Sequence, residues 1–118
     1  MRTITTDEYD FLIRVEKATG KDLHGLGLSP TALVEEMPDG GMGSLRFVVP
    51  MPENSGRRLA EVFAQGEFND ADDVLVSFTV NLDEKGRLFE LDLWRVDFEP
   101  LQRLPTENIE VRMVADSA

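Results

Sequence analysis

Residues 74–98 read VLVSFTVNLDEKGRLFELDLWRVDF, and this stretch decides the fold. Apolar and polar side chains alternate from Val74 to Leu82, which is the period-two pattern of a strand with one buried face. Residues 83–86 supply a tight turn, because Gly86 can adopt the left-handed conformation that such hairpin loops need. The chain then returns as a second strand over 87–98. The segment therefore predicts an antiparallel β-hairpin.

The two faces of the returning strand carry different side chains. One face presents Phe89, Leu91, Leu93, Arg95 and Asp97, and the other presents Leu88, Glu90, Asp92, Trp94, Val96 and Phe98. The change between acidic and apolar residues along each face indicates an edge of the core, or a β-bulge near Trp94. We interpret Trp94 as a core side chain. The alternative is a half-exposed aromatic anchor on a binding surface.

A helix is predicted before the sheet, over residues 6–19. Thr5 and Glu8 have the spacing of a capping box, and Gly20 can end the helix. One apolar stripe follows the helical period, formed by Phe11, Leu12, Val15 and Ala18. These local signals place one helix at the N-terminus.

Short extended segments separated by turns occupy most of the remaining chain, as expected for a meander. The further predicted strands cover 32–37, 42–49, 58–65 and 109–113, with a helix as the alternative for 58–65. A turn is expected at 38–41 and a loop at 50–56. The sequence thus predicts one α+β domain over 1–118, mainly an antiparallel sheet of about five to six strands with the N-terminal helix packed on it.

Composition limits the chemistry. The chain has 118 residues and no cysteine, which excludes disulfides, thiolate catalysis and cysteine-ligated metals. Residues 3–10 are polar and do not resemble a signal peptide, and no apolar run reaches the length of about 18–20 residues that a membrane span requires. We therefore expect a cytoplasmic protein that does not enter a membrane.

Acidic residues are concentrated in one part of the chain. The net charge is −11, and residues 61–99 hold 11 acidic and three basic residues. Such a field repels nucleic acid and anionic lipid and favours a cationic protein partner. The alternative is that the charge only keeps the protein soluble. The candidate partner-binding residues are Asp70, Asp72, Asp73, Glu84, Glu90, Asp92, Trp94 and Asp97.

Patterns that would indicate catalysis or cofactor binding are weak. Glu90 and Asp92 share a strand face about 7 Å apart, which could serve glycoside hydrolysis or metal binding but also fits a solvent face paired with arginines. Residues 69–73 lack the continuation of a calcium loop. Residues 40–43 do not open a helix, as a phosphate-binding loop would. The single histidine, His24, has no second histidine or cysteine nearby in the sequence and is expected to be structural or exposed. We expect no enzyme activity, no cofactor and no metal.

Two motifs resemble a known family. They are MGSLRF at 42–47 and LFELDLWRVDFEPL at 88–101, the second preceded by NLDEKG at 81–86. Together with the opening helix and residues 68–74, they resemble a family of small bacterial proteins described as a domain of unknown function. The family has no established activity, so the resemblance implies none for this chain. The size and charge of the chain are also similar to those of immunity proteins from bacterial toxin loci.

The sequence is compatible with three functions. The first is a protein-binding module, such as an immunity protein that neutralises a cationic toxin domain. The second is a small-ligand-binding protein or a carboxylate-based enzyme with Glu90, Asp92 and Asp97 around a cleft. The third is a structural protein that forms a homodimer through its edge strands.

Overall fold

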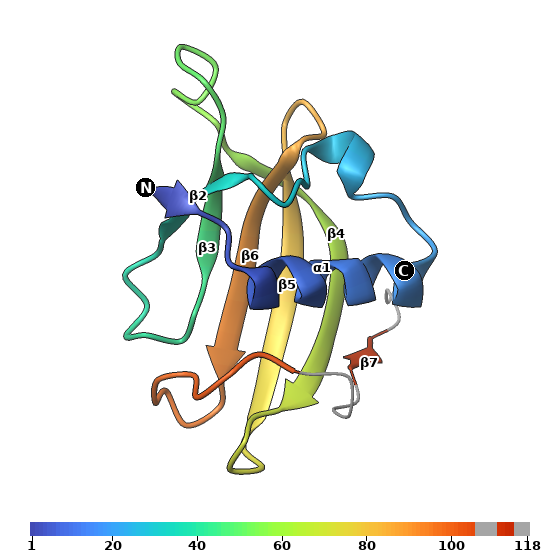
Figure 1. Ribbon diagram of the computed structural model, residues 1–118, viewed down its shortest axis with the longest axis vertical. Helices are drawn as coiled ribbons and strands as arrows, with labels where there is room; N and C mark the ends of the chain where they lie inside the picture. Colours follow the sequence, from blue (N-terminus) through green and yellow to red (C-terminus); the bar gives the residue numbers. More distant parts are fainter. Residues whose placement is uncertain (106–110, 115–118) are drawn as a thin grey trace.

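The computed structural model describes residues 1–105 and 111–114, and it shows one antiparallel sheet with a helix lying across one of its faces (Figure 1). The elements are β1 (Arg2–Thr3), α1 (Thr6–Thr19), the 3₁₀ helix η1 (His24–Leu26), β2 (Leu33–Glu36), β3 (Leu45–Val48), β4 (Leu59–Asn69), β5 (Leu75–Asp83), β6 (Leu88–Arg95) and β7 (Arg112–Met113). The α+β class is confirmed. The sheet has 7 strands, more than predicted, because the two-residue strand β1 leaves no strand signal in the sequence.

The strand order is β1-β2-β3-β6-β5-β4-β7. Strands β4, β5 and β6 form a meander, and β5 and β6 are the hairpin predicted from residues 74–98. The prediction of a meander throughout is wrong, because β3 pairs with β6 and the chain must pass two strands to reach β4. Leu45 of β3 lies opposite Leu91 of β6, so this pairing continues the apolar face of the sheet.

Helix α1 confirms the predicted capping box and covers the core. The Thr5 hydroxyl accepts the Glu8 amide at 3.1 Å, and the Glu8 carboxylate accepts the Thr5 amide at 2.9 Å. The fully buried Phe11 lies edge-on to two sheet residues, with ring centroids 5.6 Å from Phe68 and 5.0 Å from Phe78. Within the described ranges, no helix has the length and apolar character needed to cross a bilayer.

Strand β4 is longer than predicted, and the helical alternative for this segment is wrong. Its register with β5 shifts twice, which explains why residues 58–65 did not alternate cleanly. Gly66 is required by packing rather than by backbone conformation. A Cβ atom there would lie 2.8 Å from the Phe78 ring and 2.6 Å from the Arg112 carbonyl. The bare backbone therefore lets Phe78 and β7 approach β4 closely.

Strand β6 ends at Arg95, earlier than predicted. The last ladder bond there runs from the Val96 amide to the Leu75 carbonyl at 3.0 Å, because β5 itself begins at Leu75. The chain then turns through Phe98, which has a φ of 64°. The register irregularity between β5 and β6 lies at Asn81 and Leu82, and not near Trp94, where a β-bulge was one of two alternatives.

The last predicted strand, 109–113, falls partly outside the described residues. Arg112 and Met113 form β7, and residues 109–110 are not described. Val111 and Met113 pack against the core as the alternation implies.

The sheet has one core face and one open face, and strand alternation decides which side chain lies on each. Val76, Phe78 and Val80 of β5 are buried on the side of α1. Ser77 and Thr79 alternate with them and lie on the opposite face. In Figure 1 the helix crosses in front of β6, β5 and β4, so the open face is turned away from the viewer.

Candidate functional site

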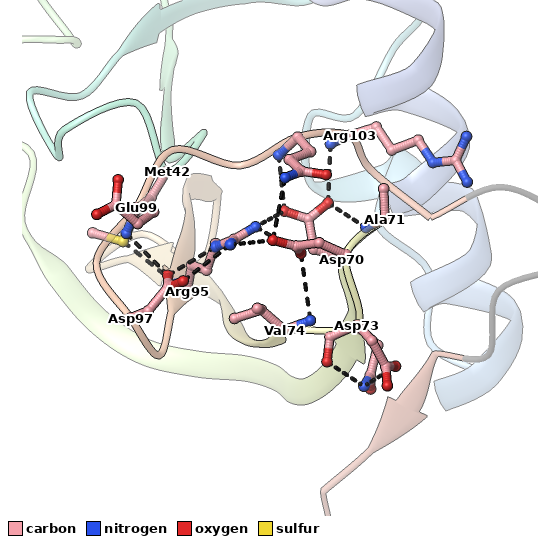
Figure 2. A network of polar contacts seen from close by, with 12 residues as sticks. Met42, Asp70, Ala71, Asp73, Val74, Arg95, Asp97, Glu99 and Arg103 are labelled. Atoms are coloured by element: carbon pink, nitrogen blue, oxygen red, sulfur yellow. Dashed lines mark hydrogen bonds and ion pairs between the residues drawn. The ribbon is translucent and has the colours of Figure 1, made fainter.

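Three of the candidate acidic residues converge on Arg95 (Figure 2). The guanidinium lies 2.8 Å from Asp70, 2.5 Å from Asp72 and 2.8 Å from Asp97, and only 5% of the Arg95 side chain is exposed. Its hydrogen bonds lower the pKa of Asp97 to about 2. Carboxylates of the β4–β5 turn and of the segment after β6 thus neutralise one internal cation. They do not form the free acidic surface that the sequence suggested.

Asp70 is the centre of this network. One carboxylate oxygen accepts the amides of Ala71 at 2.7 Å and Arg103 at 3.1 Å. The other accepts the Gln102 amide and the Arg95 guanidinium, each at 2.8 Å. Burial raises the pKa of Asp70, but these bonds, led by that of the Gln102 amide, outweigh burial and hold the pKa below its ordinary value. Asp70 therefore fastens the segment after β6 to the β4–β5 turn.

A second buried ion pair joins Arg57 to Asp83, and neither residue is among the candidates predicted from the sequence. The Nε atom of Arg57 lies 3.0 Å from the Asp83 carboxylate, and the two side chains are 3% and 1% exposed. The other guanidinium nitrogens donate to the carbonyls of Phe47 at 2.6 Å and Leu88 at 2.7 Å. The guanidinium also lies 4.9 Å from the centre of the Phe89 ring. No local signal distinguishes Arg57 from its exposed neighbour in the sequence.

Three more candidate residues have partners close by. Glu84 lies 3.0 Å from Arg58 at the exposed hairpin turn. Glu90 is buried and lies 2.8 Å from Arg46 of β3. Asp73 has a φ of 66° and accepts a hydrogen bond at 3.0 Å within its own turn. Among the candidate acids, arginines therefore pair with Asp70, Asp72, Glu84, Glu90 and Asp97, but not with Asp73.

A groove of about 240 Å³ lies on the open face of the sheet, over β5. The side chains that line it include Gln65, Glu67, Ser77, Thr79, Asp92, Trp94 and Val114. Trp94 lies opposite Ser77, and Asp92 lies opposite Thr79. The groove exists because small side chains on β5 are flanked by longer ones on β4 and β6. It brings together two of the predicted site residues, Asp92 and Trp94.

Asp92, like Asp73, forms no ion pair with any residue that the structure describes, and of the two only Asp92 lines the groove. One carboxylate oxygen accepts the Asn81 amide nitrogen at 2.9 Å, and the other has no hydrogen bond from the described part of the chain. Burial, followed by the charge of Glu90, raises the pKa of Asp92. The result is a half-buried carboxylate held in place by one oxygen and free at the other.

Trp94 lies on the open face with 53% of its surface exposed, so its interpretation as a core side chain is wrong. The core face of β6 is already filled by buried residues such as Leu93, and alternation directs Trp94 to the other side. Its ring centroid is 5.9 Å from that of Phe98, which is 68% exposed, and Val96 is also exposed. Trp94 and Phe98 therefore form an exposed aromatic pair next to the groove.

Glu90, Asp92 and Asp97 do not surround the common cleft that the alternative of a carboxylate-based enzyme predicted. Glu90 and Asp92 share the open face, as predicted, since they lie opposite Asn81 and Thr79 of β5. Asp97 instead bonds to Arg95 beyond the end of β6. The three carboxylates predicted for an enzyme therefore do not converge at this place.

His24 takes part in a chain of hydrogen bonds that the sequence did not reveal. Its Nε2 atom lies 2.7 Å from the Tyr9 hydroxyl, and its Nδ1 atom lies 2.9 Å from the Glu16 carboxylate. Glu16, Asp22 and His24 place three potential metal-ligating atoms within 4.8 Å of one another. The same Glu16 oxygen also accepts the amides of Leu23 and His24. This arrangement anchors the loop before η1 to the end of α1.

The buried carboxylates predict that the protein loses stability in acid. Burial raises the pKa of Asp83, but bonds from the Arg87 amide and the Arg57 guanidinium outweigh it, so the folded-state pKa is lowered, as it is for Asp70. Groups with lowered folded-state pKa values stabilise the protein above their unfolded pKa, near 3.8, and lose that contribution as the pH falls through the folded value. Urea unfolding should show a free energy of unfolding that declines below about pH 4. Stability that is unchanged down to about pH 2 would contradict this assignment.

Comparisons with known proteins give little beyond a family. Neither the curated proteins nor the solved structures include a match to this chain. A family model described as "Domain of unknown function (DUF6984)" matches residues 1–105, which include the helix, strands β1 to β6 and the segment that Asp70 fastens. The chain therefore belongs to the DUF6984 family.

Proposed function

We propose that the protein is a binding module that docks a cationic partner protein on the open face of its sheet, at the groove over β5. The observation that carries this proposal is the half-exposed Trp94 beside Asp92, a carboxylate without a basic partner among the described residues. Binding surfaces are enriched in tryptophan, and partly desolvated charges next to such anchors favour an opposite charge on the partner.

The charge of the chain supports the same partner class. Ion pairs within the protein involve many of the acidic residues of 61–99, but the net charge of −11 still produces a negative field around the molecule. Such a field accelerates encounter with a positively charged protein, and added salt screens it. Attraction at long range and a specific contact at Asp92 and Trp94 are therefore separate contributions to binding.

A toxin-neutralising protein is one form of this proposal. A small acidic domain that covers a basic toxin surface would use both contributions, and it would need no catalytic group. This form rests on the similarity of size and charge to immunity proteins. The binding surface itself is proposed from Asp92, Trp94 and their neighbours.

Replacing Trp94 tests the binding surface. Because the substitution Trp94→Ser removes the central aromatic anchor, we expect affinity for the partner to fall by at least about 30-fold. The wild-type protein and the variant are immobilised in parallel and exposed to extract of the source cells. Proteins retained only by the wild type are then purified, and their association is measured at several salt concentrations.

A matched control is available on the same sheet. Leu59 is 52% exposed, close to the 53% of Trp94, but it does not line the groove. Leu59→Ser should retain the partner at nearly wild-type affinity. Light scattering on the purified protein separates self-association from partner binding. A partner retained equally by Trp94→Ser, or an association rate that does not respond to salt, would refute the proposed function.

A further inference from the structure

We infer that the groove over β5 accepts an arginine side chain of the partner, stacked on Trp94 and paired with Asp92. This inference rests on the proposed function and specifies the group that the partner presents. It is drawn from the shape of the groove, from its hydrogen-bonding groups and from the way the chain already binds its own guanidinium groups.

The shape of the groove suits one long side chain. Ser77 and Thr79 form the floor on β5, with Trp94 and Asp92 on one side and Gln65 and Glu67 of β4 on the other. Adjacent strands are about 4.8 Å apart, so the two walls stand about 10 Å apart across β5. An extended chain of methylene groups fits lengthwise in such a channel, whereas a helix of about 10 Å diameter does not.

The groove contains hydrogen-bond acceptors that have no donor among the described residues. The Ser77 hydroxyl, the Thr79 hydroxyl and the Gln65 side chain form no hydrogen bond with the described residues, and one oxygen of Asp92 is also free. A guanidinium has five N–H donors and no acceptor. It can therefore bond to Asp92 and to a floor hydroxyl at the same time.

Trp94 offers the flat surface that a guanidinium prefers. Asp92 and Trp94 lie two residues apart on one strand face, about 7 Å along the strand, so a planar cation over the indole ring can also reach the carboxylate. The chain already contains this kind of contact. The guanidinium centres of Arg46 and Arg57 lie 5.2 Å and 4.9 Å from the centre of the Phe89 ring.

Arginine fits the groove better than lysine. The lysine ammonium is a compact and strongly hydrated charge, whereas guanidinium is planar, weakly hydrated and able to stack on an aromatic ring. Burial and the charge of Glu90 raise the pKa of Asp92, and a cation placed next to the free oxygen would oppose this rise by stabilising the carboxylate. The partner side of the interface is thus expected to present an exposed arginine.

Tryptophan fluorescence provides a direct test, because Trp94 is the only tryptophan in the chain. The full chain is titrated with three capped tripeptides, acetyl-Gly-X-Gly-amide, in which X is arginine, lysine or citrulline. Citrulline keeps the shape of arginine without its charge. We expect the arginine peptide to change the Trp94 emission with a dissociation constant of about 1–10 mM, and the other two to bind at least about tenfold more weakly.

Two variants distinguish the groove from general charge. Asp92→Asn keeps the size of the side chain and should weaken binding of the arginine peptide about tenfold, while Glu61→Gln removes one exposed acid of β4 that does not line the groove and should leave binding unchanged. Circular dichroism confirms that both variants are folded. Three results would overturn the arginine inference. They are equal binding of the three peptides, no emission change up to about 50 mM arginine peptide, and an Asp92→Asn variant that binds the arginine peptide as tightly as the wild type does.

The two proposals can fail separately. If Trp94→Ser abolishes capture of the partner but the arginine peptide does not bind, the binding surface stands and the arginine inference fails. If the arginine peptide binds through Asp92 but Trp94→Ser captures the partner as well as the wild type does, the groove has a ligand and the proposed function fails.

Discussion

Replacing Arg57 by methionine is expected to lower the free energy of unfolding by about 3–5 kcal/mol. Methionine preserves much of the length and apolar character of the side chain, so the loss of packing is small. The cost arises because the Asp83 carboxylate, 1% exposed, loses its buried cation and retains only the partly exposed Arg87, and because the carbonyls of Phe47 and Leu88 lose a donor each. Urea unfolding followed by circular dichroism measures the change.

The adjacent arginine is a matched control for this substitution. The Arg58 side chain is 80% exposed and pairs with Glu84 in solvent. Arg58→Met should change the free energy of unfolding by no more than about 0.5 kcal/mol, because exposed ion pairs contribute little. Equal effects of the two substitutions would show that the burial of Arg57 is not what stabilises the junction between β3 and the β5–β6 hairpin.

Replacing Asp70 by asparagine is expected to cost about 3 kcal/mol, although the two side chains have nearly the same shape. The Asp70 carboxylate accepts four N–H groups, and its side chain is fully buried. An amide has only one oxygen, so its NH₂ group must face N–H donors, and Arg95 loses a buried counter-charge. Thermal and urea unfolding both report the loss.

This substitution should also act on one part of the chain more than on the rest. The amides of Gln102 and Arg103 donate to Asp70, so their hydrogen exchange should accelerate more than that of the β5 amides. Asp73→Asn is the control in the same turn. Asp73 is exposed with a φ of 66°, a conformation that asparagine also tolerates, and the expected change is below about 0.5 kcal/mol. Uniform acceleration throughout the sheet would contradict a local fastening role for Asp70.

The elements that could be predicted from the sequence are those whose signals are local. The capping box of Thr5 and Glu8 and the stripe through Phe11 lie within one helix, so the bounds of α1 follow from adjacent residues. The hairpin follows in the same way from alternation and from Gly86, whose φ is 75°. The bulges of β4 obscured its period, and two-residue strands such as β1 are too short to have one.

The candidate site was predictable only in part. Sequence spacing placed Asp92 and Trp94 on one strand face, and the structure agrees. The spacing in the sequence could not show that this face is the open one, because both faces of β6 contain apolar and acidic residues. It also missed Arg57 and Asp83, which are separated by 26 residues in the chain and meet only in the folded protein.

The sequence alone determined a helix, a central hairpin, an antiparallel α+β fold and an excess of negative charge, because each of these follows from neighbouring residues or from composition. Only the tertiary structure decided which candidate carboxylates pair with arginines and which, such as Asp92, do not. Arg95 meets Asp70 across 25 residues of chain, and Arg46 meets Glu90 across 44. The energy of an ion pair depends on distance in space and on burial, and neither can be read from distance along the chain.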